Sequence, residues 1–293
     1  MKLIKLLKIA IILFFLGTYL SFSQYTEIIN SNRPGNSSGA FSVGQDILQL
    51  ENGFYYSNEK HDLLNYTAKG YGFNFNIRYG FLTEKLEIVL NGVFHADKLK
   101  DHRYTPSNNY NRKNFKDFKI GAKYLVFDPR KNEDDSPNVY SYWADKKFNF
   151  KNLIPAISIF VGLNVDSKNN PFTAPNIKGV SPSISLITQS NFTNRSALII
   201  NLNSTRIGSN QNDFEYIFSL THAFNEKFIA YVEKHGIKSD FYAENKLSFG
   251  LTYLFKKNIQ FDLGSTTNFK NTPEIFNINL GFSYRYQLNK TND

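Results

Sequence analysis

The 293-residue sequence contains no cysteine, and this absence excludes several kinds of site. Disulfide scaffolds, zinc–thiolate sites, iron–sulfur clusters and thiol catalysis all require cysteine. After residue 23 the chain also lacks the apolar run of about 20 residues that a helical membrane span requires. Aromatic side chains are abundant instead, with 28 phenylalanines and 18 tyrosines. This aromatic content argues against a disordered chain.

Residues 1–23 have the three parts of a secretory signal peptide. Three lysines precede a short apolar core at 9–16, and Ser21 and Ser23 supply the small residues before a cleavage site at Gln24. The alternative is an N-terminal membrane anchor, for which the apolar run is short. We therefore expect an exported chain, whose net charge falls from +9 to +6 when the three lysines are removed.

The mature chain alternates between apolar and polar residues, which is the period of a half-buried β-strand. Twelve strands are predicted, at 46–56, 66–79, 86–94, 115–127, 153–166, 179–189, 196–206, 214–224, 228–237, 245–255, 259–267 and 275–288. Soluble strands usually have about 5–6 residues, whereas a tilted membrane strand needs about 9–11. The predicted fold class is therefore all-β, a transmembrane antiparallel up-and-down β-barrel of about 12 strands. The alternative is a soluble barrel with an aromatic core.

The connections between these segments alternate between short turns and longer polar loops, as in outer-membrane barrels with periplasmic turns. One connection, 128–152, is long where a short turn is expected, so it is either a periplasmic insertion or a miscounted pair of strands. The domain prediction has four parts. These are a signal peptide at 1–23, a periplasmic or lumenal segment at 24–45, the barrel at 46–288 and a tail at 289–293.

If the apolar face contacts lipid, the opposite face lines the lumen. The candidate lumen residues, five acids and five bases, are Glu51, Arg78, Glu87, Lys119, Lys123, Glu215, Glu233, Lys246, Asp262 and Arg285. They form either a polar channel lining that selects solutes or ion pairs that hold the barrel together without transport. Twelve strands lie between the filled barrels of about eight strands and the open pores of about 16–18, which predicts a narrow passage or a small cavity.

The segment 24–45 is long enough to enter the lumen, where Arg33 is a candidate plug residue. Its guanidinium group would pair with a lumenal carboxylate, such as that of Glu51 or Glu233. The alternative is a mobile periplasmic tail with a simple turn at Arg33-Pro34-Gly35.

The sequence indicates no catalytic residue, metal site or cofactor. A membrane-embedded lipid hydrolase would need a serine–histidine pair near the exterior, but His222 is predicted near a periplasmic turn and no G-x-S-x-G motif is present. The predicted loop 95–114 contains His95, Asp97 and further titratable groups that could bind a metal, but interleaved lysines favour a solvated loop of mixed charge. No basic stripe is present, so nucleic-acid binding is unsupported.

Several segments resemble a family of outer-membrane transporters named for the meta-cleavage pathway of phenol degradation. The segments are Ser31-Asn32-Arg33-Pro34-Gly35, Ile47-Leu48-Gln49-Leu50-Glu51-Asn52-Gly53, Ile77-Arg78-Tyr79-Gly80, Glu84-Lys85-Leu86-Glu87, Gly121-Ala122-Lys123-Tyr124, Tyr231-Val232-Glu233 and Gln260-Phe261-Asp262. The chain has Asn32 where the family commonly has aspartate. The ending Asn279-x-Gly281-x-x-Tyr284-x-Tyr286 is similar to the signal read by the barrel-assembly machinery.

The resemblance implies a barrel in the outer membrane of a Gram-negative bacterium. The expected function is a channel or transporter for a small solute of hydrophobic or aromatic character. The expected partners are the lipid bilayer, the barrel-assembly machinery and a small solute of unknown identity. Two alternatives stay open, namely a filled structural or surface-binding barrel and a lipid hydrolase.

Overall fold

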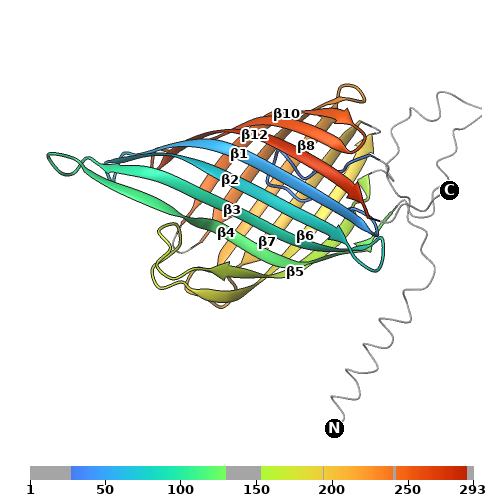
Figure 1. The fold of residues 1–293 in the computed structure, drawn as a ribbon, viewed down its shortest axis with the longest axis horizontal. Helices are drawn as coiled ribbons and strands as arrows, with labels where there is room; N and C mark the ends of the chain where they lie inside the picture. The colour runs from blue at the N-terminus through green and yellow to red at the C-terminus, as the bar shows by residue number, and fades with distance from the viewer. Residues whose placement is uncertain (1–27, 130–152, 194, 240–241, 289–293) are drawn as a thin grey trace, which may run out of the picture.

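The computed structural model describes residues 28–129, 153–193, 195–239 and 242–288, and these form a closed antiparallel β-barrel (Figure 1). Each strand pairs with its neighbours in sequence, and the first strand closes the barrel against the last. The strands are β1 (Ile47–His61), β2 (Tyr66–Gly80), β3 (Leu86–Asp101), β4 (Asn108–Phe127), β5 (Ala156–Asp166), β6 (Gly179–Thr193), β7 (Ser196–Thr205), β8 (Asp213–Ala223), β9 (Phe228–Lys238), β10 (Glu244–Lys256), β11 (Ile259–Asn268) and β12 (Glu274–Gln287). The predicted fold class is confirmed.

Within these residues, no helix has both the length and the apolar character needed to cross a bilayer.

The two faces of the barrel wall differ in polarity, as the alternation predicts. On β12, Ile278 and Leu280 point outward with 44% and 62% of their surfaces exposed, whereas Ser283 and Arg285 point inward with 0% and 5% exposed. Because closure pairs every strand edge, the wall leaves no row of unpaired backbone groups in the hydrocarbon layer. The exterior therefore suits lipid, and the interior is polar.

Several strands are longer than predicted, and the largest differences affect the loops between β1 and β2 and between β3 and β4. β1 continues to His61, β3 continues to Asp101 and β4 begins at Asn108, so the predicted loops 57–65 and 95–114 are largely strand. β3 and β4 form the long hairpin at the left of Figure 1. The predicted bounds follow the apolar alternation, which stops before the outer ends of β1, β3 and β4. Cross-strand pairing continues there because the backbone ladder does not require an apolar face.

Short turns connect the strands at the barrel end where β1 begins and β12 ends, and this end faces the periplasm in barrels of this type. The long connection between β4 and β5 also lies at this end, with 130–152 outside the described residues. Because the twelve strands close the sheet, the alternative of a miscounted strand pair is wrong. The predicted signal peptide and C-terminal tail also lie outside the described residues.

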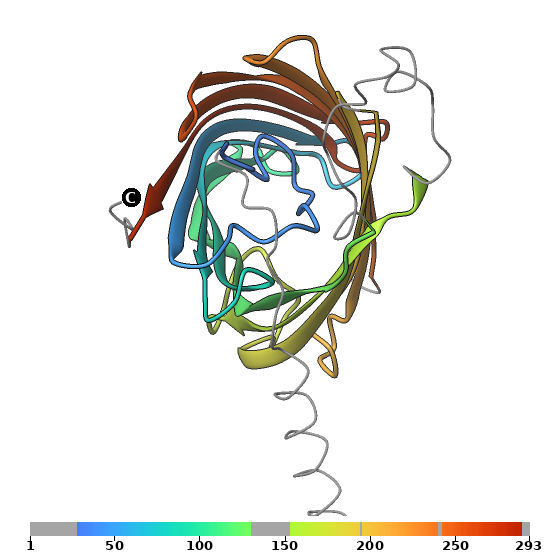
Figure 2. The same ribbon diagram turned by 90° about the vertical axis from the view of Figure 1, so that its right-hand side faces the viewer.

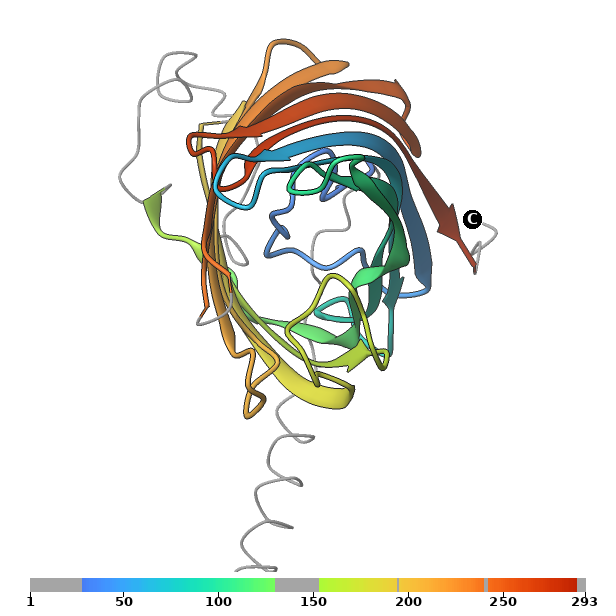
Figure 3. The same ribbon diagram turned by 90° about the vertical axis from the view of Figure 1, so that its left-hand side faces the viewer.

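Residues 28–46, named the plug segment below, run inside the barrel before β1 begins (Figure 2). They contain no helix or strand. The sequence left two possibilities for 24–45, a segment inside the lumen or a periplasmic tail. The described part of this segment lies in the lumen, and 24–27 lie outside the described residues. The opposite view shows the loop between β5 and β6 at the other mouth of the barrel (Figure 3). The lumen thus has a plugged periplasmic half and an outer half below the loops.

Candidate functional site

The part of the plug segment around Arg33 is called the plug tip below, and the Arg33 side chain holds it to the wall. Its guanidinium group donates from Nε and Nη2 to the two carboxylate oxygens of Asp262, at 3.0 and 2.9 Å. Gly53 on β1 pairs with Gly281 on β12, which pairs in turn with Asp262 on β11. A Cβ atom at either glycine would collide with the guanidinium group. Two glycines and one aspartate on adjacent strands therefore form the binding surface for Arg33.

Carboxylates of the wall also bind the plug backbone. Glu233 accepts hydrogen bonds from the backbone N–H groups of Asn36 and Ser37, at 2.9 and 3.1 Å. Glu51 accepts one from the N–H of Asn32 at 3.3 Å. An irregular backbone inside a barrel needs such partners because an unpaired buried N–H is costly. These carboxylates therefore accept hydrogen bonds from plug N–H groups that would be paired within a helix or a sheet in regular secondary structure.

Cationic groups of the wall bind the plug carbonyls. Arg78 donates to the carbonyl of Asn30 at 2.8 Å, and Lys123 donates to the carbonyl of Gly39 at 2.7 Å. Glu87 lies between these two cations, 3.0 Å from Arg78 and 2.8 Å from Lys123. The three side chains are almost fully buried. Their charges are thus paired with each other while their remaining donors hold the plug.

An apolar contact completes the attachment of the plug. Ala40 is fully buried against Leu125, Ala156 and Ile187 of the wall, with Phe41 packed beside them. Ser158 donates to the carbonyl of Ala40 at 2.5 Å. The C-terminal part of the plug is therefore anchored by packing, and its tip is held by polar contacts alone.

The structure places all ten candidate lumen residues inside the barrel and divides them into two groups. Seven contact the plug or its ion-pair network, namely Glu51, Arg78, Glu87, Lys123, Glu233, Asp262 and Arg285. The other three line the outer half of the lumen, namely Lys119, Glu215 and Lys246. Arg33 pairs with a lumenal carboxylate, but this carboxylate belongs to Asp262 and not to Glu51 or Glu233, the two examples that the sequence suggested. Asp262 faces the two glycines that leave room for the guanidinium group.

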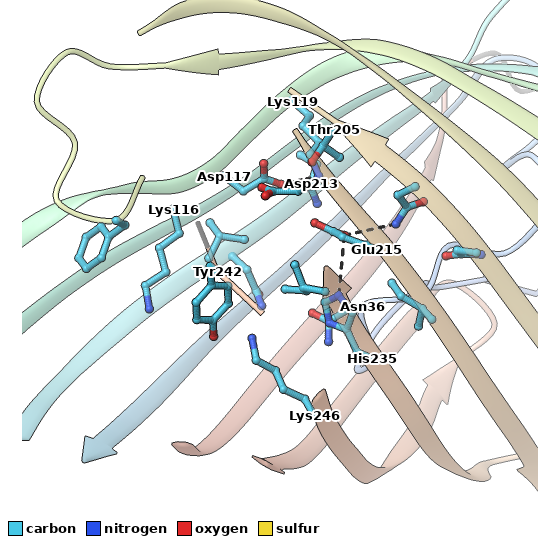
Figure 4. A pocket seen from close by; sticks show the side chains of 18 of the residues that line it. Asn36, Lys116, Asp117, Lys119, Thr205, Asp213, Glu215, His235, Tyr242 and Lys246 are labelled. Atoms are coloured by element: carbon cyan, nitrogen blue, oxygen red, sulfur yellow. Dashed lines mark hydrogen bonds and ion pairs between the residues drawn. The ribbon is translucent and has the colours of Figure 1, made fainter. Parts of the chain in front are cut away.

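The outer half of the lumen contains a cavity of about 940 Å³. Plug residues 32, 33 and 35–38 form its floor, and side chains of the strands and outer loops form its walls. Figure 4 shows Lys116, Lys119 and Lys246 pointing into this space, together with Tyr242 and Glu215. A smaller pocket of about 50 Å³ lies between the plug and the wall and shares Asn32 and Arg33 with the cavity floor. The plug tip therefore separates two spaces along the lumen.

The sequence prediction missed Lys116 because β4 contains a bulge. The pairing of β3 with β4 moves from Asp117 to Phe115 without a partner for Lys116. A bulge turns the following residues to the other face of the sheet, so Lys116 and Asp117 both line the cavity while Phe115 is exposed outward. The signal in the sequence is two polar residues between Phe115 and Phe118, where strict alternation has one.

Arg112 and Arg206 also line the cavity. The sequence places Arg112 in the predicted loop 95–114 and Arg206 at the end of the predicted strand 196–206. Arg112 lies on the extended part of β4 and binds Asp97 at 2.6 Å. Arg206 follows β7 and binds Asp166 and Asp213 at 3.0 and 3.1 Å. Burial lowers the pKa of Arg206, but these carboxylates outweigh that effect and raise the pKa overall. Both guanidinium groups are therefore fixed as cations by bound acids.

Tyr242 lies in the outer loop before β10. Burial, followed by the negative charge of Glu244, raises the pKa of its hydroxyl above the usual range. The hydroxyl therefore stays protonated and donates to Glu244 at 2.6 Å. This bond fixes the orientation of the ring in the cavity wall.

The histidines occupy other environments. His222 accepts or donates one hydrogen bond with Ser196, at 2.8 Å, on the outer surface near the periplasmic turns. This pair has no carboxylate partner among the described residues, and it lies away from the exterior end. His235 faces Glu215 at 3.7 Å. The described residues include no cluster of three or more His, Asp or Glu side chains placed to hold a metal ion.

The chain is similar to solved structures of membrane-associated proteins. An outer membrane channel from Pseudomonas putida F1 matches with a TM-score of 0.55 and 8% identity, covering 87% of this chain and 100% of that chain. The translocator domain of the autotransporter NalP from Neisseria meningitidis matches with a TM-score of 0.49 and 8% identity, covering 87% and 90%. At these identities the first match shows the fold alone.

A search of the curated proteins finds no match to this sequence. A family model matches residues 31–286, which cover most of the plug segment and the twelve strands up to Tyr286. Its description is "Putative MetA-pathway of phenol degradation". The chain belongs to this family.

Proposed function

We propose that this protein is an outer-membrane channel for a small solute, with the plug segment acting as its gate. The observation that carries the proposal is the cavity of about 940 Å³, which ends on a floor of plug residues. A barrel built only for structure would gain stability by filling this space, since an interior packs as densely as a crystal.

The attachment of the plug also supports gating. Its tip is held by exchangeable polar contacts to Asp262, Glu233 and Glu51, with no strand pairing. The net contribution of each such hydrogen bond is about 0.5–1.5 kcal/mol, and somewhat more to a charged group. Release of the tip around Arg33 would join the outer cavity to the smaller pocket on the periplasmic side.

The family description supports an aromatic solute of the phenol type. The proposal includes insertion by the barrel-assembly machinery, through the ending that contains Gly281, Tyr284 and Tyr286. It includes no catalytic step, because the Ser196–His222 pair lacks an acid partner among the described residues.

The test is conductance of refolded residues 24–293 in a planar bilayer, compared with a chain that begins at Asp46. We expect small, intermittent steps from the longer chain and steps at least about tenfold larger from the shorter one, because the floor of the cavity is removed. Folding of both is checked by heat-modifiable mobility on a gel. Silence from two correctly folded chains would contradict the channel and favour the alternative of a filled structural barrel.

A further inference from the structure

The outer cavity contains two cations that form no ion pair within the described residues. Eight Lys and Arg side chains line it, and six of them pair with carboxylates. The six pairs are Arg33–Asp262, Arg112–Asp97, Lys119–Asp117, Lys123–Glu87, Arg206–Asp166 and Lys270–Glu244. Within the described part of the chain, the ammonium groups of Lys116 and Lys246 make no ion pair and no hydrogen bond.

These two lysines come from opposite parts of the wall and converge on one space. Lys116 projects from the bulge of β4, and Lys246 lies on β10. Figure 4 shows both side chains pointing to the space beside the Tyr242 ring. They are within electrostatic range of each other, so each repels the other when no anion is present. An anion placed between them would remove this repulsion.

Carboxylates near the pair are engaged elsewhere. Glu244, Glu215 and Glu59 are within electrostatic range of Lys246, and Glu59 is also within range of Lys116. Glu244 is bound by Tyr242 and Lys270. Glu59 accepts a hydrogen bond from Tyr66 at 2.5 Å, and Glu215 faces His235 at 3.7 Å. Asp97 is within range of Lys116 but is bound by Arg112. None of these acids forms an ion pair with Lys116 or Lys246 within the described residues, so both ammonium groups stay available to a ligand.

Two aromatic rings border the same space. The Phe172 ring lies 5.1 Å from Lys116 Nζ and 5.2 Å from Arg112 Cζ, measured to the ring centroid. Its loop is tied to β4, because Asn170 donates to the carbonyl of Phe115 at 2.7 Å. The Tyr242 ring is fixed by Glu244. Flat rings beside two ammonium groups suit a ligand that has both an anionic group and a planar apolar body.

We propose that Lys116 and Lys246 form an anion-binding site in the outer cavity that takes a small aromatic carboxylate, with Phe172 and Tyr242 contacting its ring. The inference deepens the proposed function, since it names the charge and class of the solute that the channel would admit. The carboxylate lies between the two ammonium groups, which supply charge-assisted hydrogen bonds.

The test measures binding to the purified, detergent-solubilised barrel of residues 24–293 by titration calorimetry. The probe is benzoate, and benzyl alcohol of similar shape is the neutral comparison. We expect benzoate to bind at least about tenfold more tightly than benzyl alcohol, with an affinity that falls as salt rises because the contact is electrostatic. Equal binding of the two probes would overturn the proposal, and so would no detectable benzoate binding.

The variants Lys116→Gln and Lys246→Gln are compared with Lys113→Gln. Lys113 is exposed on the same strand, so its substitution controls for the change in net charge. We expect each cavity variant to weaken benzoate binding about tenfold and the control to leave it unchanged, with heat-modifiable mobility intact in all three. An equal loss in the control would contradict the site. Inorganic phosphate binding as tightly as benzoate would contradict the role of the rings.

Failure of this site and failure of the channel give different results. Benzoate binding to a barrel that stays silent in a bilayer, with or without residues 24–45, would contradict the channel and keep the site. Conductance together with no benzoate binding would keep the channel and contradict the site.

Discussion

The two halves of the lumen differ in how their charges are used. Around the plug, cations such as Arg78 and Lys123 contact both a carboxylate and a plug carbonyl. In the outer half, Lys116 and Lys246 face an open cavity. Burying a charge is costly unless it is paired and hydrogen-bonded. Fully paired charge therefore indicates a structural role, and unpaired charge around a cavity indicates a place for a ligand.

Segments that resemble the family supply contacts in the half of the lumen around the plug. Arg33, Gly53 and Asp262 come from three separate segments, and the fold brings them into one contact. Lys116 and Lys246 lie outside those segments. The segments that carry the family resemblance therefore include those that hold the plug.

The largest loss of stability is expected when a fully buried ion pair is broken. Glu87→Ala would leave Arg78 and Lys123 without their shared carboxylate and would free the N–H of Val43. Removing one partner of a buried ion pair typically costs about 3–5 kcal/mol. The measurement is the urea midpoint of the refolded barrel, and Glu226→Ala in an exposed turn is the control. A loss no greater than that of the control would mean that this half of the lumen does not depend on its charge pairs.

A smaller effect on stability, but a clear one on gating, is expected at the plug tip. Arg33→Met removes the bidentate contact and leaves Asp262 buried without its cation. We expect a higher open probability in single-channel recordings, because the tip loses its strongest contact. Adding Asp262→Asn removes the unpaired charge and should recover part of the lost stability. If the recordings match those of the unmodified barrel, Arg33 is not part of the gate.

The smallest loss of stability is expected when the space around the Arg33 guanidinium group is narrowed without a change in charge. A methyl group added by Gly53→Ala would collide with the Arg33 guanidinium group. Overpacking of this kind costs about 1–3 kcal/mol. The same substitution in a chain that begins at Asp46 is the matched control, since that chain lacks Arg33. The unfolding midpoint should fall only in the longer chain. An equal fall in both would assign the cost to the strand rather than to the plug.

Alternation with period two determined most of the fold. Phe276, Ile278 and Leu280 are exposed to the outside while Ser283 and Arg285 are buried, because a strand in a bilayer must separate lipid from lumen. The same rule identified inward-facing charges such as Glu51 and Glu233. It ends β3 too early and begins β4 too late, because pairing continues beyond the apolar band without a sequence pattern to mark it.

Tertiary structure alone decided which charges meet. The sequence places Arg33 and Asp262 far apart, and the pairing of β1, β12 and β11 brings them together beside two glycines. It also decided that Lys116 faces the cavity, since a bulge is a property of two paired strands and not of one. Local alternation sets the face on which a side chain lies, but only closure of the barrel sets its neighbours across the lumen.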